Sequence, residues 1–328
     1  MPDSTTARNE RYRQARNRGG QFLLGHMRPD GGYGNPERGL ADYYKVPLAL
    51  ITCGEGRAAG RLLDWVRKNG MQLDGDLGPR PPAAYGYYHT YYNTWLIMGA
   101  HRQGQFDLSQ RGADFLLKTW DPDSGGFYSS ATEKSPETPQ EIWVACGAGL
   151  AVLYAGRMEA ARGLGRWLAN LLEAQPDYPN RLYAVWSKAG GLQTSFPEEE
   201  RVRYVFTPSE PTNQYFFQSG IAAGFLAQLY KATGEAKWLK LAEDYLGQAT
   251  LACDHHFTNY QSGKVGWAGA VLYTLTGKPE WRTLAARVGD WLVGMQAANG
   301  SWDAGDSTID YTAEMVVWLD EIDQALGG

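Results

Sequence analysis

Cysteine is scarce in this chain of 328 residues, which has only Cys53, Cys146 and Cys253. Three cysteines far apart in the sequence form no disulfide framework and are typical of a reducing compartment. Long apolar runs are also missing: the longest nearly uncharged stretch, 143–156, is too short to span a bilayer, and residues 1–18 are polar throughout. We therefore expect a cytoplasmic protein with no integral membrane segment.

Positive charge is in short supply as well. The chain has 31 Lys and Arg against 36 Asp and Glu, a formal net charge of −5, and no basic stripe. Because the protein has no basic surface that would attract phosphate groups, we do not expect nucleic acid as a partner. The expected partner is a small-molecule substrate. No phosphate loop, nucleophile elbow or dinucleotide fingerprint occurs, so we expect no cofactor. The stretch Cys253-Asp254-His255-His256 lacks the spacing of a zinc site, and we expect no metal.

Aromatic residues and glycine are abundant instead, with 20 Tyr, 12 Trp and 40 Gly. Hydrophobic residues make up 43% of the chain and charged residues 20%, enough apolar surface for a sizeable core, which excludes a disordered protein. Many of the rings must belong to that core. Their number also favours a pocket lined by ring faces.

A repeated pattern organises the chain. A helical stretch ends in an aromatic-Leu pair and is followed about ten residues later by a glycine-aromatic turn. The clear copies contain Phe22-Leu23, Phe115-Leu116 and Trp291-Leu292, and weaker copies centre on Trp65, Trp167 and Tyr245. These centres predict six units, with one longer gap that holds an insertion at 176–211.

Within each unit the apolar spacing is helical, so each unit is predicted to be a helical hairpin. The second helices, such as 144–153 and 221–229, are apolar on all sides, whereas the first helices carry charged residues on one face. Helices that are apolar all round need neighbours on every side, which favours a closed ring over an open solenoid. We therefore predict an all-α fold, an (α/α)6 toroid formed as a single domain by residues 1–328.

The stretch 291–302 contains Gln296-Ala-Ala-Asn-Gly300-Ser-Trp302. It resembles the QW repeat of the squalene and terpenoid cyclases and of the related protein prenyltransferases. In those proteins an outer helix, a Gln and a Gly-x-Trp turn staple adjacent helices. The resemblance implies the α/α toroid. The same architecture also serves glycosidases, polysaccharide lyases and sugar epimerases, and a fold by itself does not fix a function.

A second resemblance concerns 308–313. This segment is similar to the Asp-x-Asp-Asp-Thr-Ala segment of class II terpene cyclases and keeps the middle Asp, the proton donor of that family, as Asp310. The first and last Asp of the motif are replaced here by Thr308 and Tyr311. Glu314 lies one turn later on the same helix face, and two carboxyls that share a site can have separated pKa values.

In a closed ring the second helices all begin at one mouth, so polar residues at their starts should converge there. Such residues are costly in a buried helix unless they serve a pocket or are satisfied by neighbours. We predict the catalytic residues to be Asp310, Glu314, His89, Glu141 and Asp42. The predicted substrate-binding residues are Tyr44, Tyr88, Tyr92, Asn93, Trp143, Gln214, Tyr215, Gln218, Lys264 and Trp267. Lys45, Gln261 and Tyr311 also lie at helix starts.

An aromatic cavity with carboxylates and one imidazole fits two chemistries, because ring faces stabilise carbocations and also stack on sugars. The first hypothesis is a cofactor-independent cyclase or isomerase of a polyene or isoprenoid substrate. The alternative is a carbohydrate-active enzyme, that is a hydrolase, a lyase or an epimerase, and a third is a non-enzymatic binding module. The insertion at 176–211 enters just before an inner helix, and we expect it to form a lid over the mouth or a surface for a partner.

Overall fold

The computed structural model describes residues 5–80 and 88–327. Six outer helices each carry one of the six repeat centres. They are α1 (Thr5–Leu24), α4 (Gly56–Asn69), α6 (Phe106–Leu117), α8 (Met158–Glu173), α11 (Ala236–Ala249) and α13 (Pro279–Met295). The inner helices are α3 (Val46–Thr52), preceded by the single turn α2 (Leu40–Tyr43), then α5 (His89–Arg102), α7 (Ile142–Tyr154), α10 (Phe217–Thr233), α12 (Gly263–Thr276) and α14 (Thr308–Gly327).

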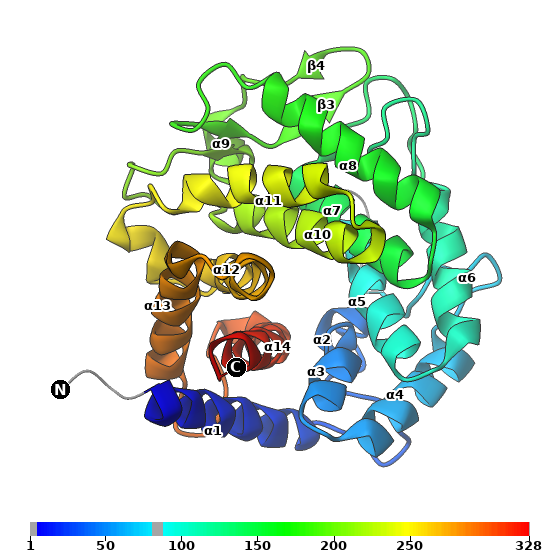
Figure 1. Ribbon diagram of the computed structural model, residues 1–328. Coiled ribbons are helices and arrows are strands. Elements are labelled where there is room, and N and C mark those ends of the chain that lie inside the picture. Colours follow the sequence, from blue (N-terminus) through cyan, green and yellow to red (C-terminus); the bar gives the residue numbers. More distant parts are fainter. Residues whose placement is uncertain (1–4, 81–87, 328) are drawn as a thin grey trace.

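The inner helices form a closed ring (Figure 1). Each packs against the next in chain order, and the last inner helix, α14, packs against both α12 and α3. The first outer helix, α1, lies along α14, where the side-chain amide of Asn9 donates to the carbonyl oxygen of Asp323 at 2.9 Å. The prediction of an (α/α)6 toroid is confirmed.

The glycine-aromatic repeat has a direct structural cause. In the last unit the indole N–H of Trp302 donates to the carbonyl oxygen of Leu292 at 2.8 Å, and in the first unit the hydroxyl of Tyr33 donates to the carbonyl oxygen of Leu23 at the same distance. The amide of Gln296 donates to the carbonyl oxygen of Ala15 at 2.7 Å and joins α13 to α1. The aromatic side chain therefore holds the turn on its own outer helix, and in the last unit Gln296 also fastens α13 to the neighbouring α1.

Small residues let the inner helices approach closely. A Cβ atom on Gly220 of α10 would lie 2.7 Å from the backbone nitrogen of Val265 in α12, and one on Gly224 would lie 2.1 Å from the Trp267 ring. A side chain can move aside, but the backbone of a packed helix cannot do so without shifting the ring. Glycine at 220 thus sets the spacing of α10 and α12.

We predict that Gly220→Ala lowers the free energy of unfolding by about 1–3 kcal/mol, because the added methyl group meets backbone atoms. Gly247→Ala in the outer helix α11 is the matched control: nothing lies within 4 Å of its Cβ position. There the change should raise stability by about 0.5–1 kcal/mol, since alanine favours the helix. Urea unfolding followed by circular dichroism measures both, and equal effects of the two variants would contradict the argument.

The segment between α8 and α10 holds short elements: β2 (Leu182–Tyr183), β3 (Val185–Ser187), β4 (Gly191–Leu192), α9 (Glu198–Tyr204) and β5 (Val205–Phe206). Strand β3 pairs antiparallel with β4 and with β1 (Gln140–Glu141), while β2 pairs with β5. The pairing of β1 with β3 fixes the insertion against the start of α7. Short 3-10 helices lie at η2 (Asp254–Phe257), η3 (Tyr260–Ser262) and η4 (Gly305–Ser307).

No helix within residues 5–80 and 88–327 combines the length and the apolar character that crossing a membrane requires.

Candidate active site

A cavity of about 180 Å³ lies where the inner helices begin. Every inner helix contributes to it, directly or through the residues just before its first turn. The lining residues are Tyr44, Lys45, Tyr88, Tyr91, Tyr92, Trp143, Tyr215, Phe217, Tyr260, Gln261, Lys264, Ser307, Asp310, Tyr311 and Glu314. The mouth predicted from helix direction is therefore a real cavity, rich in aromatic rings.

Four charged side chains form one cluster in this cavity. The ammonium groups of Lys45 and Lys264 each bond one carboxylate oxygen of Glu314. The Lys45 ammonium also lies 3.0 Å from Oδ1 of Asp310. Both lysines and Glu314 are buried, whereas the Asp310 side chain is 21% exposed. Asp310 is thus the carboxyl of the cluster that a ligand can reach.

The two carboxyls have opposite pKa shifts. Burial acts to raise the pKa of Glu314, but the charges of Lys264 and Lys45 outweigh it and bring the value to about 2. Burial raises the pKa of Asp310, the charge of Glu314 adds to that effect, and Lys45 opposes it. Glu314 is therefore fixed as a carboxylate, while Asp310 is the group suited to hold and release a proton.

Aromatic rings form the wall of the cavity around Trp143. The Trp143 ring centroid lies 4.6 Å from that of Tyr88, 4.8 Å from Tyr91 and 5.1 Å from Phe217. On the other side Tyr44 and Tyr92 meet at 4.7 Å. Such walls offer flat apolar faces with hydroxyl groups at their edges.

Eight of the residues predicted from the sequence line this cavity. They are Asp310, Glu314, Tyr44, Tyr88, Tyr92, Trp143, Tyr215 and Lys264. The structure brings them together from all six inner helices or the residues just before them.

His89 and Asn93 do not line the cavity and instead belong to a network around Asp76. The Nε2 atom of His89 lies 2.8 Å from Oδ2 of Asp76, and the amide of Asn93 donates to Oδ1 at 2.8 Å. Arg80 donates to the same carboxylate oxygen at 2.7 Å. This network fastens Asp76 and Arg80 to the first turn of α5.

Asp42, Gln214 and Trp267 also lie outside the cavity. Asp42 accepts from the guanidinium of Arg38 at 2.6 Å and from the backbone N–H of Asn35 at 3.0 Å. Gln214 accepts from the backbone N–H of Thr207 at 2.6 Å. Trp267 lies deeper in the ring and stacks on Trp318, with ring centroids 4.7 Å apart.

Glu141 and Gln218 lie behind the aromatic wall, next to the insertion. The side-chain amide of Gln218 donates to Oε1 of Glu141 at 2.6 Å and to the carbonyl oxygen of Arg203 in α9 at 3.2 Å. Burial raises the pKa of Glu141 to about 7, although the bond from Gln218 acts in the opposite direction. This pair connects the start of α7 to the insertion.

The raised pKa of Glu141 predicts a pH effect on stability. The unfolded chain loses this proton near the ordinary value of 4.5 and the folded chain near 7, so the contribution of Glu141 falls as the pH rises between them. Glu141→Gln, which cannot ionise, should gain up to ~3 kcal/mol relative to the parent between pH 5 and pH 8. Urea unfolding of both proteins across that range tests this. A stability difference that does not change with pH would contradict it.

Lys45 is the main cavity-lining residue that was not among the predicted site residues. It lies at the start of an inner helix, directly before the apolar run Val46-Pro47-Leu48, and a buried lysine there needs a partner. Its partner Glu314 is 269 residues away in the sequence. Tyr260 and Ser307 of the short helices before α12 and α14 were missed because no periodic pattern marks them.

The likeness of this chain to known proteins lies in its structure. No protein-family model matches the chain, and no curated protein matches it in sequence. Among solved structures it is similar to a D-mannose isomerase, with a TM-score of 0.70, 13% identity and coverage of 98% of this chain and 97% of that one.

Two further structures are similar in the same way. One is an inactive variant of the α-1,6-mannanase GH76A of Salegentibacter sp. HEL1_6 in complex with α-1,6-mannotetrose, with a TM-score of 0.67, 12% identity and coverage of 96% and 99%. The other is an unsaturated glucuronyl hydrolase specific for heparin, with a TM-score of 0.61, 11% identity and coverage of 97% and 96%. At these identities the likeness establishes the fold.

These similarities contradict the function that was inferred from the resemblance to the squalene and terpenoid cyclases and the protein prenyltransferases. The three structures are carbohydrate-active enzymes and not terpenoid cyclases, so the prediction of a polyene or isoprenoid cyclase was wrong. The structure gives the reason for the false resemblance. Trp302 holds the turn that follows α13 and Gln296 bonds the neighbouring outer helix α1, while Asp310 is paired with Lys45 in a charged cluster.

Proposed function

We propose that this protein is a carbohydrate-active enzyme that isomerises or epimerises a small sugar by proton transfer in the cavity at the start of the inner helices. The observation that carries the proposal is a single reachable carboxyl, Asp310, beside two buried ammonium groups, Lys45 and Lys264. The shared toroid fold of a mannose isomerase and a mannanase supports the substrate class.

The cavity wall suits a sugar. The faces of Trp143 and Tyr88 can stack on the C–H face of a sugar ring, and the hydroxyls of Tyr311 and Ser307 and the amide of Gln261 can bond its hydroxyl groups. Stacking and hydrogen bonding together orient a polyhydroxyl ligand in a way that an all-apolar cavity could not.

The charged cluster suits proton transfer next to a carbonyl. In an open-chain aldose, the Asp310 carboxylate takes the proton from C2 while electrons move to the carbonyl oxygen, which gives an enediolate. The ammonium groups of Lys45 and Lys264 stabilise the negative oxygen. Protonated Asp310 then returns the proton to C1 while the hydroxyl proton on O2 passes to O1, which gives a ketose. If the enediolate first rotates about the C2–C3 bond, Asp310 meets the other face of C2 and returns the proton there, which gives an epimer.

Glycoside hydrolysis fits this cluster less well. A hydrolase needs two carboxyl groups that flank the scissile bond. Among the described residues that line the cavity, the second carboxyl is Glu314, and both of its oxygens are bonded to lysine. Only Asp310 is left to act on a substrate.

We further propose that the chain acts as one domain and that residues 176–211 cover the cavity as a lid. Two contacts support this: the amide of Gln218 bonds the carbonyl oxygen of Arg203, and the backbone N–H of Tyr215 donates to the carbonyl oxygen of Val202 at 2.9 Å. Tyr215 lines the cavity, so a movement of α9 reaches the site.

We also propose a cytoplasmic location. The free thiols of Cys53, Cys146 and Cys253 support it, because unpaired cysteines are typical of a reducing compartment.

Proton NMR of sugars in D2O tests the reaction. The protein is incubated with a panel of neutral aldoses and, separately, with α-1,6-mannotetrose. We expect the C2 proton signal of one aldose to disappear as deuterium is incorporated, together with new signals of a ketose or an epimer. New reducing-end signals from the tetrasaccharide alone would replace the isomerase proposal with a hydrolase, and binding without any change of the sugars would favour a binding protein.

A further inference from the structure

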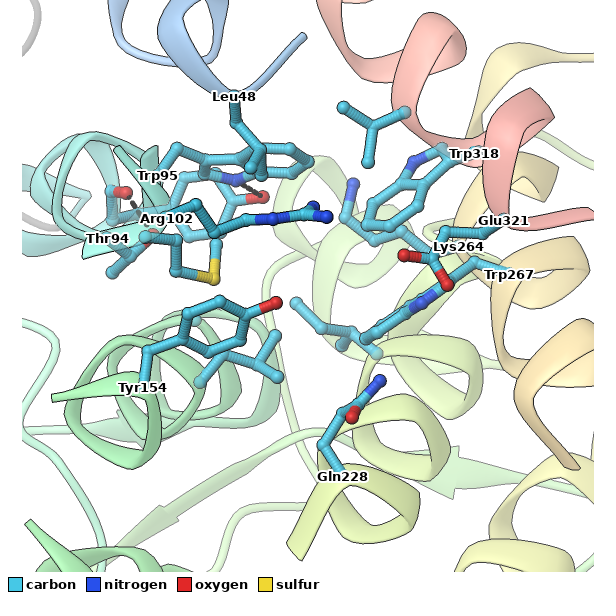
Figure 2. A pocket seen from close by; sticks show the side chains of 16 residues that line it. Leu48, Thr94, Trp95, Arg102, Tyr154, Gln228, Lys264, Trp267, Trp318 and Glu321 are labelled. Carbon is cyan, nitrogen blue, oxygen red and sulfur yellow. Dashed lines mark hydrogen bonds between the residues drawn. The ribbon is translucent and has the colours of Figure 1, made fainter. Parts of the chain in front are cut away.

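A second cavity of about 40 Å³ lies in the centre of the ring, farther along the inner helices than the candidate active site (Figure 2). Three tryptophans form its inner surface. Trp318 stacks on Trp267 and meets Trp95 edge to face, with ring centroids 5.4 Å apart. Nothing in the proposed reaction uses these residues.

The charged cluster separates the two cavities. Glu314 binds both lysines on one side and accepts from the indole N–H of Trp318 at 3.0 Å on the other. Tyr91, which lines both cavities, accepts from the indole N–H of Trp95 at 3.1 Å. Lys264 also lines both cavities, but the three tryptophans line the second cavity and not the first.

Four polar side chains converge on this chamber from four different inner helices. They are Arg102 of α5, Tyr154 of α7, Gln228 of α10 and Glu321 of α14, and their polar ends point toward one another in Figure 2. Arg102 acts electrostatically on Glu321 and Tyr154, but within residues 5–80 and 88–327 no hydrogen bond or salt bridge joins any of the four side chains to another residue. Polar groups that gather without protein partners are available to a ligand.

The charges of the chamber select the kind of ligand. Three charged side chains line the chamber, and one of them, Lys264, is already bonded to Glu314. Of the other two, Arg102 would repel a cation and Glu321 would repel an anion, so the pair favours a neutral molecule that both donates and accepts hydrogen bonds. The indole rings favour a ligand with an apolar face. A neutral sugar has both properties.

We propose that the chamber bounded by Trp95, Trp267 and Trp318 is a second sugar-binding site, which takes one neutral sugar ring or the end of a neutral oligosaccharide. Because the enclosed space is small, the ring enters only in part. Its outer hydroxyl groups then lie at the rim beside Arg102, which is exposed. This proposal does not rest on the reaction proposed for the first cavity.

Indole N–H signals of the 15N-tryptophan-labelled full chain test the proposal, because each cavity contains its own reporter. Trp267 reports on the second chamber and Trp143 on the first cavity, and Trp→Phe variants assign their signals. D-glucose, D-mannose, D-galactose and N-acetyl-D-glucosamine are titrated separately to about 100 mM, well above the millimolar Kd of weak ligands. We expect at least one of them to shift the Trp267 signal along a saturable curve that differs from the Trp143 curve.

Two variants and one control then identify the site. Gln228→Ala and Tyr154→Phe should each raise the Kd measured at Trp267 by about 5- to 10-fold, the loss expected for one hydrogen bond. Asp310→Asn, in the first cavity, should leave that Kd unchanged. A Trp267 signal that no sugar moves, or one whose response is insensitive to both variants, would overturn the second site. A Trp143 response that is absent while Trp267 responds would instead count against the proposed function alone.

Discussion

Replacing Asp310 by asparagine is expected to lower kcat by about 10²-fold or more, since the change keeps the shape of the side chain and removes its proton. The substrate identified by the deuterium exchange experiment is used for the measurement. Because Asp310 is the reachable carboxyl of the cluster, exchange of the C2 proton should fall in parallel with kcat. KM should change much less, because the aromatic wall that binds the sugar stays in place.

Asp320→Asn is the matched control for this variant. Asp320 lies on the same helix, is also largely buried, and is paired with Arg16 of α1 away from the cavity. The control can lose some stability, but its kcat should stay within about twofold of the parent. If turnover is unchanged in Asp310→Asn and is lost in Glu141→Gln or His89→Ala, then Asp310 is not the catalytic acid and the acid lies in another part of the ring.

Glu314→Gln should cause a large loss of stability. The substitution leaves Lys45 and Lys264 buried without the carboxylate that both of them bond. Breaking a buried ion pair by removing one partner costs about 3–5 kcal/mol, because the remaining charge is uncompensated. Urea unfolding at pH 7 measures the loss. Asp244→Asn, which removes an exposed pair with Lys240, is the control and should change stability by less than about 1 kcal/mol.

The lowered pKa of Glu314 also predicts how the free energy of unfolding depends on pH. This pKa is about 2 in the folded protein and 4.5 for an unperturbed glutamate. The contribution of ~3 kcal/mol from Glu314 is therefore fully present above pH 4.5 and is lost as the pH falls toward 2. The difference between the parent and Glu314→Gln should therefore shrink between pH 5 and pH 2. A difference that persists undiminished at pH 2, or a variant as stable as the parent at pH 7, would contradict the burial of this cluster.

Much of the fold could be predicted from the sequence because its signals are local. The aromatic-Leu pairs recur along the chain and mark outer helices, as Phe22 of α1 and Trp291 of α13 illustrate. Helices such as α7 and α12 are apolar on all sides and therefore had to be enclosed. These patterns arise within one helix or one turn, where spacing alone decides which residues share a face.

The candidate site could be predicted only in part. Helix direction correctly brought Asp310, Glu314 and Trp143 to one mouth. The sequence does not show how each helix is rotated about its axis. In the structure this rotation directs His89 toward Asp76 and Asp42 toward Arg38 instead of toward the cavity. One residue along a helix changes the direction of a side chain by about 100°, so a list of helix starts cannot tell lining residues from residues behind the wall.

The sequence by itself determined the all-α class, the six hairpins and the end of the ring at which polar residues gather, because periodicity and helix direction are properties of the chain. Only the tertiary structure decided which polar residues meet. Closure of the ring brings Lys45 of the first unit against Glu314 of the last, and Arg102, Gln228 and Glu321 around a second chamber. Such contacts depend on how helices from distant parts of the chain pack, and no local pattern in the sequence carries that information.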